Sequence, residues 1–271
     1  MTRPIAILGL PQDNNSSFLQ GPALAPARIR EAFHSASANM FTETGHDLGA
    51  DGAWRDAGDL LLDGLSGQVA YDAIYAGVSD TLESGDPLIS LGGDHSVAFP
   101  AIMAHADRYE DLSILQVDAH ADLYDDFDGN PFSHASPFAR LMETERIRKL
   151  VQVGIRTLTA HQREQVERFN IDVHEMSDLS RINDIHLDGP MYLSLDLDGL
   201  DPAFAPGVGH HEPGGLSTRM VIDLIHGFGG QLIGGDIVEL NPHRDLHGMT
   251  AMVAGKLLKE MMGRIIKDMR G

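Results

Sequence analysis

Short apolar runs alternate with helix-like stretches along this chain, and the alternation constrains its fold more than any other feature. The apolar runs are Pro4–Leu10, Pro87–Leu91, Ser113–Asp118, Lys149–Gly154, Met191–Asp196 and Gln231–Asp236. Helical periodicity occupies residues near 67–84, 96–108, 133–147, 159–168, 217–228 and 249–268. Strands that alternate with helices predict a parallel sheet covered by helices on both faces. Because no linker-like segment and no repeat of about 20–50 residues divides the chain, we expect one α/β domain over residues 1–271.

The charge balance and the absence of cysteine narrow the range of functions. The 271 residues include 20 Lys and Arg against 40 Asp and Glu, which gives a formal net charge of −20. Since an acid-rich surface repels phosphate groups, we expect no nucleic-acid partner and no docking on an anionic membrane. Cysteine is absent, which excludes disulfides, thiolate metal sites and cysteine nucleophiles.

Segments that direct proteins to membranes or organelles are not recognisable. No apolar run approaches the ~18–20 residues of a membrane span. The N-terminal residues lead directly into Pro4–Leu10, with neither a signal-peptide pattern nor an Arg- and Ser-rich transit pattern. We therefore expect a soluble cytoplasmic protein.

Side chains that can bind metal ions gather where three of the apolar runs end. They are His95 within Gly92–Ser96, then Asp118, His120 and Asp122, and finally Asp196 and Asp198. In an extended chain, alternate residues such as Asp118, His120 and Asp122 point to one face. Ligands bind beyond the carboxyl ends of parallel strands, so we expect the three groups to meet at one edge of the sheet.

Four carboxylates and two imidazoles at one place suggest a pair of divalent cations. Four carboxylates at close range repel one another, and two such cations would neutralise their charge of about −4. Oxygen-rich ligation with some imidazole and no thiolate suits Mn²⁺ better than structural Zn²⁺. A lone Asp-x-Asp pair is commonly a solvated loop, so the hypothesis depends on the three groups together. Asp94 and Asp201 also suit structural roles, in orienting neighbours and in setting a turn.

These groups resemble the three signatures of the ureohydrolases, a family that includes arginase, agmatinase, guanidinobutyrase and formimidoylglutamase. The similarity extends over most of the chain. Further segments resemble plant-type arginases in particular: Asn15–Glu31, Ser133–Arg140, Glu212–Ser217, Val238–Asp245 and Gly248–Val253. Together the motifs are specific for the family and much less specific for the substrate.

The resemblance implies a three-layer α/β/α fold on a mostly parallel, doubly wound sheet of eight strands. It also implies a binuclear Mn²⁺ centre, with two ions per chain, that makes urea from a small guanidino substrate. One ion would be held by His95, Asp118, Asp122 and Asp196, and the other by Asp118, His120, Asp196 and Asp198. Family members commonly assemble as trimers or hexamers, so a homo-oligomer is expected by analogy.

Two further residues receive catalytic roles from the resemblance. Glu239 matches the family carboxylate that receives the guanidinium, a planar group that a carboxylate can bind through two hydrogen bonds. His134 matches the family histidine that supplies a proton to the leaving amine. Without the resemblance, Glu239 would be interpreted as a solvated strand-end acid and His134 as a surface loop residue.

The identity of the guanidino substrate is the most open question. We expect L-arginine to be hydrolysed better than agmatine, with guanidinobutyrate as a further alternative. The resemblance places Asn130 and Ser133 on the substrate carboxylate, while both residues would also suit caps of a turn and a helix. His210 and His211 would line the outer pocket or serve as polar turn residues. The segment Gly154–Ala160 lacks the acid with which animal-type arginases bind the substrate amino group.

Three other interpretations can be tested by metal analysis. A deacetylase-type hydrolase with one Zn²⁺ would not need all six ligands, and a non-catalytic family subunit would have lost some of them. A nucleotide-binding protein would carry Gly-x-Gly-x-x-Gly, which is absent here. Two Mn²⁺ per chain would favour a ureohydrolase, one Zn²⁺ a deacetylase-like enzyme, and no metal a binding protein.

Overall fold

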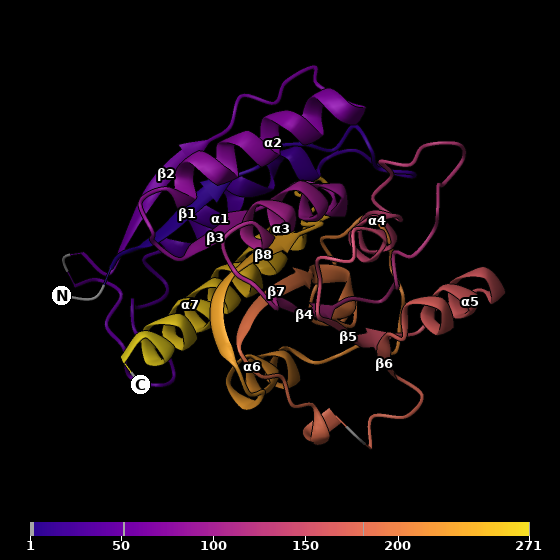
Figure 1. Cartoon of the computed structure of the whole chain (residues 1–271). Coiled ribbons are helices and arrows are strands. Elements are labelled where there is room, and N and C mark those ends of the chain that lie inside the picture. Colours follow the sequence, from indigo (N-terminus) through magenta and orange to yellow (C-terminus); the bar gives the residue numbers. More distant parts are fainter. Residues whose placement is uncertain (1–2, 51, 181, 271) are drawn as a thin grey trace.

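A computed structural model describes residues 3–50, 52–180 and 182–270, and in these residues eight strands form one sheet (Figure 1). The strands are β1 (Ile5–Gly9), β2 (Trp54–Asp59), β3 (Leu88–Leu91), β4 (Ser113–Val117), β5 (Lys149–Ile155), β6 (Asp172–Glu175), β7 (Pro190–Asp196) and β8 (Gln231–Val238). Their order is β2-β1-β3-β8-β7-β4-β5-β6, and every pairing is parallel. The predicted parallel eight-stranded sheet is confirmed.

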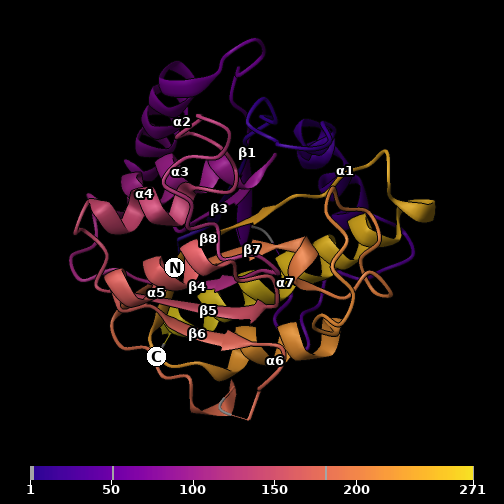
Figure 2. The same ribbon diagram turned by 90° about the vertical axis from the view of Figure 1, so that its right-hand side faces the viewer.

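Helices cover both faces of the sheet (Figure 2). One layer contains α2 (Gly67–Leu82), α3 (Ala98–Ala106), α4 (Pro137–Glu143) and α5 (Ala160–Phe169). The opposite layer contains α1 (Ala25–Phe33), α6 (Thr218–Gly227) and α7 (Met249–Arg270). The three-layer α/β/α arrangement expected from the sequence is therefore present.

Burial explains which strands the sequence revealed. Every residue of β3 and of β4 is buried, because helices cover both faces of these central strands. The two edge strands, β2 and β6, are mostly half-buried or exposed and contain no continuous apolar run. The sequence pattern therefore predicted the central strands and missed β2 and β6. It also missed helix α1, which follows the proline-containing turn Pro22–Leu24.

The order of the strands brings distant segments together in the middle of the sheet. After β3 the chain crosses to β4 and continues outward through β5 and β6. It then returns to place β7 and β8 between β3 and β4. The carboxyl ends of β3, β8, β7 and β4 therefore lie side by side at the centre of one edge, which is where parallel sheets place their ligand sites.

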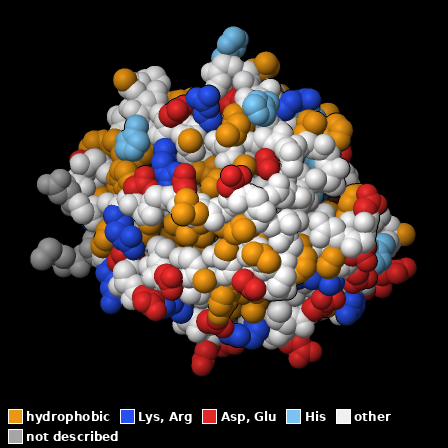
Figure 3. Space-filling model, turned by 90° about the horizontal axis from the view of Figure 1, so that it is seen from above, with side chains coloured by type: hydrophobic (Ala, Val, Ile, Leu, Met, Phe, Trp, Pro, Cys, Tyr) orange, Lys and Arg blue, Asp and Glu red, His pale blue; other side chains and the backbone are white. Residues whose placement is uncertain are grey.

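The surface carries the acidic excess that the composition indicates. Figure 3 shows Asp and Glu side chains over much of one face, with fewer Lys and Arg among them. Within the described residues, no helix has the length and apolar character required to cross a membrane.

Candidate metal centre

Loops that follow the central strands pack closely enough to bring the predicted ligands together. His95 begins a short 3-10 turn after β3, Asp118 follows β4, and Asp196 ends β7. A Cβ atom on Gly93 would lie 1.7 Å from the carbonyl oxygen of Gln12, and one on Gly199 would lie 2.8 Å from the backbone nitrogen of Asp118. Only glycine fits at these two contacts, so both glycines are needed to assemble the site.

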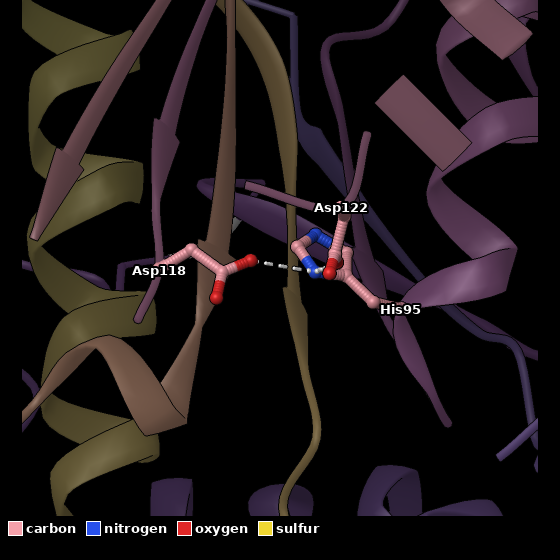
Figure 4. A group of neighbouring side chains, drawn as sticks. All are labelled: His95, Asp118 and Asp122. Atoms are coloured by element: carbon pink, nitrogen blue, oxygen red, sulfur yellow. Dashed lines mark ion pairs between the residues drawn. The ribbon is translucent and has the colours of Figure 1, made fainter. Parts of the chain in front are cut away.

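The first group of ligand atoms surrounds His95. Its Nδ1 lies 3.0 Å from Oδ2 of Asp118, 3.0 Å from Oδ2 of Asp122 and 3.2 Å from Oδ2 of Asp196. Figure 4 shows His95 with Asp118 and Asp122, their polar atoms facing one another. One imidazole nitrogen carries at most one proton, so it cannot satisfy three buried carboxylates. A cation among these atoms would satisfy all of them.

A second group lies beside the first and shares one residue with it. Nδ1 of His120 lies 3.1 Å from Oδ2 of Asp198 and 3.6 Å from Oδ1 of Asp118. Three residues in each group have ligand atoms close enough to one another to hold a metal ion: His95, Asp118 and Asp122 in the first, and Asp118, His120 and Asp198 in the second. Asp118 belongs to both, as expected for a carboxylate between two metal positions.

The electrostatics of the carboxylates also fit cations. Burial, together with the charge of Asp118, raises the pKa of Asp122 to about 6. Burial and the neighbouring Asp198 raise the pKa of Asp196 well above its usual range. Backbone N–H groups already orient the oxygens: that of His120 donates to Oδ1 of Asp118, and that of Asp198 donates to Oδ1 of Asp196, each at 2.7 Å. The donor set therefore fits divalent cations that prefer oxygen with some imidazole.

Hydrogen bonds behind His95 fix the orientation of its ring. The hydroxyl of Ser194 donates to Oδ1 of the buried Asp236 at 2.8 Å, so its oxygen accepts from Nε2 of His95 at 2.9 Å. This places the proton of His95 on Nε2 and directs the Nδ1 lone pair at the carboxylates.

His134 and Glu239 form a contact next to the metal ligands. Glu239 follows β8 with a left-handed backbone, φ +65°. Its Oε1 accepts from Nδ1 of His134 at 2.7 Å and from the backbone N–H of His95 at 2.9 Å. Burial disfavours a charged imidazole, but Glu239 outweighs burial and raises the pKa of His134 to about 9. In turn, His134 and the His95 N–H hold the pKa of Glu239 below its usual range despite burial.

One cavity of about 220 Å³ connects the ligand groups with this pair. Its walls include Asp122, Asp196 and Asp198 from the metal groups, and His134 and Glu239 beside them. His210 also lines it, with its ring centroid 5.6 Å from that of His120 and 5.4 Å from that of His134. Two roles were considered for His210, lining the outer pocket or serving as a polar turn residue. The structure supports the first.

Comparison with known proteins agrees with this geometry. The sequence profile of the arginase family matches residues 3–263. This chain belongs to the arginase family. It is 44% identical to "Arginase 1, mitochondrial" of Oryza sativa subsp. indica, covering 96% of this chain and 81% of that protein. It is 31% identical to an agmatinase of Bacillus anthracis, covering 95% of this chain and 90% of the relative.

Solved structures of the arginase family have the same architecture. An arginase from Medicago truncatula superposes with a TM-score of 0.91 at 41% identity, covering 97% of this chain and 88% of that one. The family and fold predicted from the sequence are thereby confirmed, and the chain is an arginase-family hydrolase.

The prediction of a cytoplasmic protein is wrong in the light of these relatives. The rice enzyme, and similar arginases of Arabidopsis thaliana and Medicago truncatula, are described as mitochondrial. The prediction depended on the absence of a recognisable targeting segment, and such an absence does not identify a compartment.

Two residues predicted to bind the substrate carboxylate do not line the arginase-family cavity. The side chain of Asn130 accepts from the backbone N–H of Phe132, and its amide donates to Oδ1 of Asn15 at 3.3 Å. Ser133 is buried and accepts from the backbone N–H of Ala135. Asn130 caps a turn, as the sequence also allowed, whereas Ser133 caps a turn and not a helix, because α4 begins only at Pro137. Their contact with substrate stays a prediction.

His211 is not among the residues that line this cavity. Its side chain is exposed, and its Nε2 lies 2.7 Å from the carbonyl oxygen of Pro206. Of the two roles considered for His211, the structure supports the polar turn.

Sequence reasoning missed several residues of the cavity wall. They are Ser17, Tyr124, Phe127, Thr157, Gln162 and Glu212. Ser17 and Glu212 lie in segments that resemble plant-type arginases, so those motifs could have indicated them. Their place in the wall depends on loops far apart in the sequence, which no local pattern reveals.

Proposed function

We propose that this chain hydrolyses L-arginine to L-ornithine and urea at a binuclear Mn²⁺ centre. The observation that carries the proposal is the contact of His134 with Glu239 on a cavity shared with two groups of metal-ligand type. His95, Asp118, Asp122 and Asp196 would hold one ion, and Asp118, His120, Asp196 and Asp198 the other. When bound, the ions would supply hydroxide at neutral pH and stabilise developing negative charge.

Glu239 would receive the guanidinium. Its Oε1 is occupied by His134 and by the backbone N–H of His95. Within the described residues no hydrogen bond occupies its Oε2, so this oxygen is available to guanidinium N–H donors. The charge of Glu239 also keeps His134 protonated, as the leaving amine requires.

The outer wall offers an acceptor for the other end of the substrate. Glu212 lines the cavity, and its carboxylate has no hydrogen-bond or ion-pair partner in the part of the chain that the structure describes. We assign to it the α-ammonium of arginine, which leaves His210 to contact the aliphatic part of the substrate. The relatives named arginase, at 44% identity, favour arginine over agmatine. Agmatine and 4-guanidinobutyrate remain the alternative substrates.

The test is kcat/KM for L-arginine, agmatine and 4-guanidinobutyrate after loading with Mn²⁺, together with metal analysis. We expect two Mn²⁺ per chain and the highest value for arginine. A higher value for either of the other substrates would refute the arginine assignment and leave a ureohydrolase. Absence of urea from all three would refute the proposed function.

We further propose that residues 1–271 act as one domain within a homo-oligomer, a trimer or hexamer, which light scattering will test.

A further inference from the structure

Both ring nitrogens of the buried His134 are occupied. The residue as a whole is only 8% exposed. Nδ1 donates to Oε1 of Glu239, and Nε2 lies 3.1 Å from the backbone nitrogen and 2.8 Å from Oγ of Ser17. Because a backbone N–H can only donate, Nε2 accepts from it when His134 is neutral; when His134 is protonated, its Nε2–H donates to Oγ of Ser17 instead. Apart from the cavity that His134 itself lines, its proton exchange therefore has two routes, through Glu239 and through Ser17.

The two neighbours differ in their access to solvent. Glu239 is only 4% exposed and is expected to hold the substrate. Ser17 is exposed and also lines the cavity. Its hydroxyl can donate and accept at once, which is the property that a proton relay requires. Ser17 is thus the neighbour of His134 that connects it both with the cavity and with bulk water.

The segment that carries Ser17 is held firmly in place. Oδ2 of the buried Asp94 accepts from the backbone N–H of Asn15 at 3.1 Å and from the hydroxyl of Ser16 at 3.2 Å. The carbonyl oxygen of Asn15 accepts from the backbone N–H of His134 at 3.2 Å. Asp94, which the sequence suggested as an orienting residue, therefore fixes the position of Ser17 relative to His134.

Ser17 carries no charge, so other residues set the electrostatic environment of His134. Glu239, Asp94 and Asp122 are the carboxylates that act on it, and the ring of His210 lies on its cavity side. Removing the Ser17 hydroxyl leaves these groups unchanged. It also leaves Nδ1 of His134 on Glu239, so the ring keeps the bond that holds its position in either protonation state. A substitution at Ser17 can therefore separate proton transfer from positioning.

We propose that Ser17 relays the proton between His134 and the leaving amine. The inference rests on the proposed function, in which His134 is the proton donor. As the amine departs, the O–H bond of Ser17 breaks and an N–H bond forms on the amine. The Nε2–H bond of protonated His134 breaks at the same time, and a new O–H bond forms on Ser17. His134 is left neutral, and solvent returns a proton through the same hydroxyl.

The experiment compares Ser17→Ala, Ser17→Thr and Ser16→Ala in the Mn²⁺-loaded enzyme. Ser16→Ala is the matched control for loop position, because its hydroxyl contacts Asp94 and not His134, so its loss removes an anchor of the loop but no step of the proposed relay. We expect Ser17→Ala to lower kcat about tenfold or more, with KM and Mn²⁺ content unchanged. The expected loss does not exceed the ~10²–10⁴-fold contribution of a general acid to the rate. Water can enter the space that the hydroxyl leaves and carry the proton in its place. Ser17→Thr retains a hydroxyl and is expected to recover most of the activity.

Added imidazole provides the readout that a structural role would not change. As a small proton carrier it should restore turnover of Ser17→Ala in a concentration-dependent way and leave wild type and Ser16→Ala unaffected. Wild-type kcat in Ser17→Ala would overturn the relay. Equal losses in Ser17→Ala and Ser17→Thr without an imidazole response would also overturn it, since they would assign the side chain to packing. Urea release by the wild type in the same assay tests the proposed function separately.

Discussion

Nδ1 of His134 donates a 2.7 Å hydrogen bond to Oε1 of Glu239, a residue 105 positions away in the sequence. The left-handed backbone of Glu239 turns its carboxylate back over the end of the sheet, where it also caps the N–H of His95. One acidic residue thereby connects the proposed proton donor with the loop that carries a metal-type ligand. The two halves of the site are expected to respond differently to substitution.

Replacing His134 should impair turnover without loss of metal. In His134→Ala we expect kcat to fall by roughly 10²-fold or more, the scale of general acid–base catalysis. Mn²⁺ content, measured by atomic absorption, should stay as in wild type, because His134 belongs to neither ligand group. A decrease in bound Mn²⁺ would make His134 a ligand, and wild-type turnover would remove its catalytic role.

The pH dependence of turnover should report the same histidine. A proton donor must be protonated to act, and the pKa of His134 is raised to about 9. We therefore expect kcat to be nearly constant from neutral pH upward and to fall as the pH rises through about 9. The profile of His134→Ala should lack this basic limb. A wild-type profile that falls already near the ordinary histidine pKa of about 6.5 would contradict the effect of Glu239.

Replacing the shared carboxylate should remove both metal and activity. Asp118→Asn is expected to lose bound Mn²⁺ and nearly all turnover, since Asp118 faces both ligand groups. Asp196→Asn should behave similarly, because it shares the His95 position. Asp125→Asn is the control: Asp125 is exposed, bonds Gln165, and should affect activity far less. Two bound ions and full activity in Asp118→Asn would refute the ligand assignment.

Removal of metal should destabilise the fold as well as stop the reaction. Without cations, burial and then the repulsion between neighbouring carboxylates disfavour the charged forms, which raises the pKa of Asp122 and of Asp196. We expect chelation to lower Tm and two equivalents of Mn²⁺ per chain to restore it, because a ligand that binds the native state stabilises it. Calorimetric titration and thermal melts will measure both. An unchanged Tm together with one Zn²⁺ per chain would favour a mononuclear site.

Glu212 should discriminate substrates by their amino group. In Glu212→Gln we expect KM to rise about tenfold for L-arginine and agmatine, which both carry an ammonium group, because a charge-assisted hydrogen bond is lost. 4-Guanidinobutyrate has no ammonium group and provides the internal control. An equal change in KM for all three substrates would assign Glu212 to the shape of the loop.

Much of the fold and of the metal centre could be predicted from the sequence, for a local physical reason. Buried parallel strands are short continuous apolar runs, so Leu88–Leu91 and Ser113–Val117 can be recognised without coordinates. Their carboxyl ends lie at one edge, so the ligand-type residues that follow them could be grouped in advance. Edge strands such as Trp54–Asp59 carry no such signal because solvent reaches them.

The tertiary structure alone decided how the cavity is completed. Ser17 lies 117 positions from His134 in the sequence, and its hydroxyl reaches Nε2 because Asp94 anchors the preceding residues Asn15 and Ser16. Asn130 and Ser133, which the motif placed near the substrate, turn their side chains into local caps. Spacing along a strand fixes which face a side chain occupies, but Asp118 and His120 follow the end of β4, and the direction of a loop side chain depends on the loops packed against it. The meeting of these candidate ligands at one edge of the sheet could therefore be predicted from the sequence, while the remaining walls of the site could not.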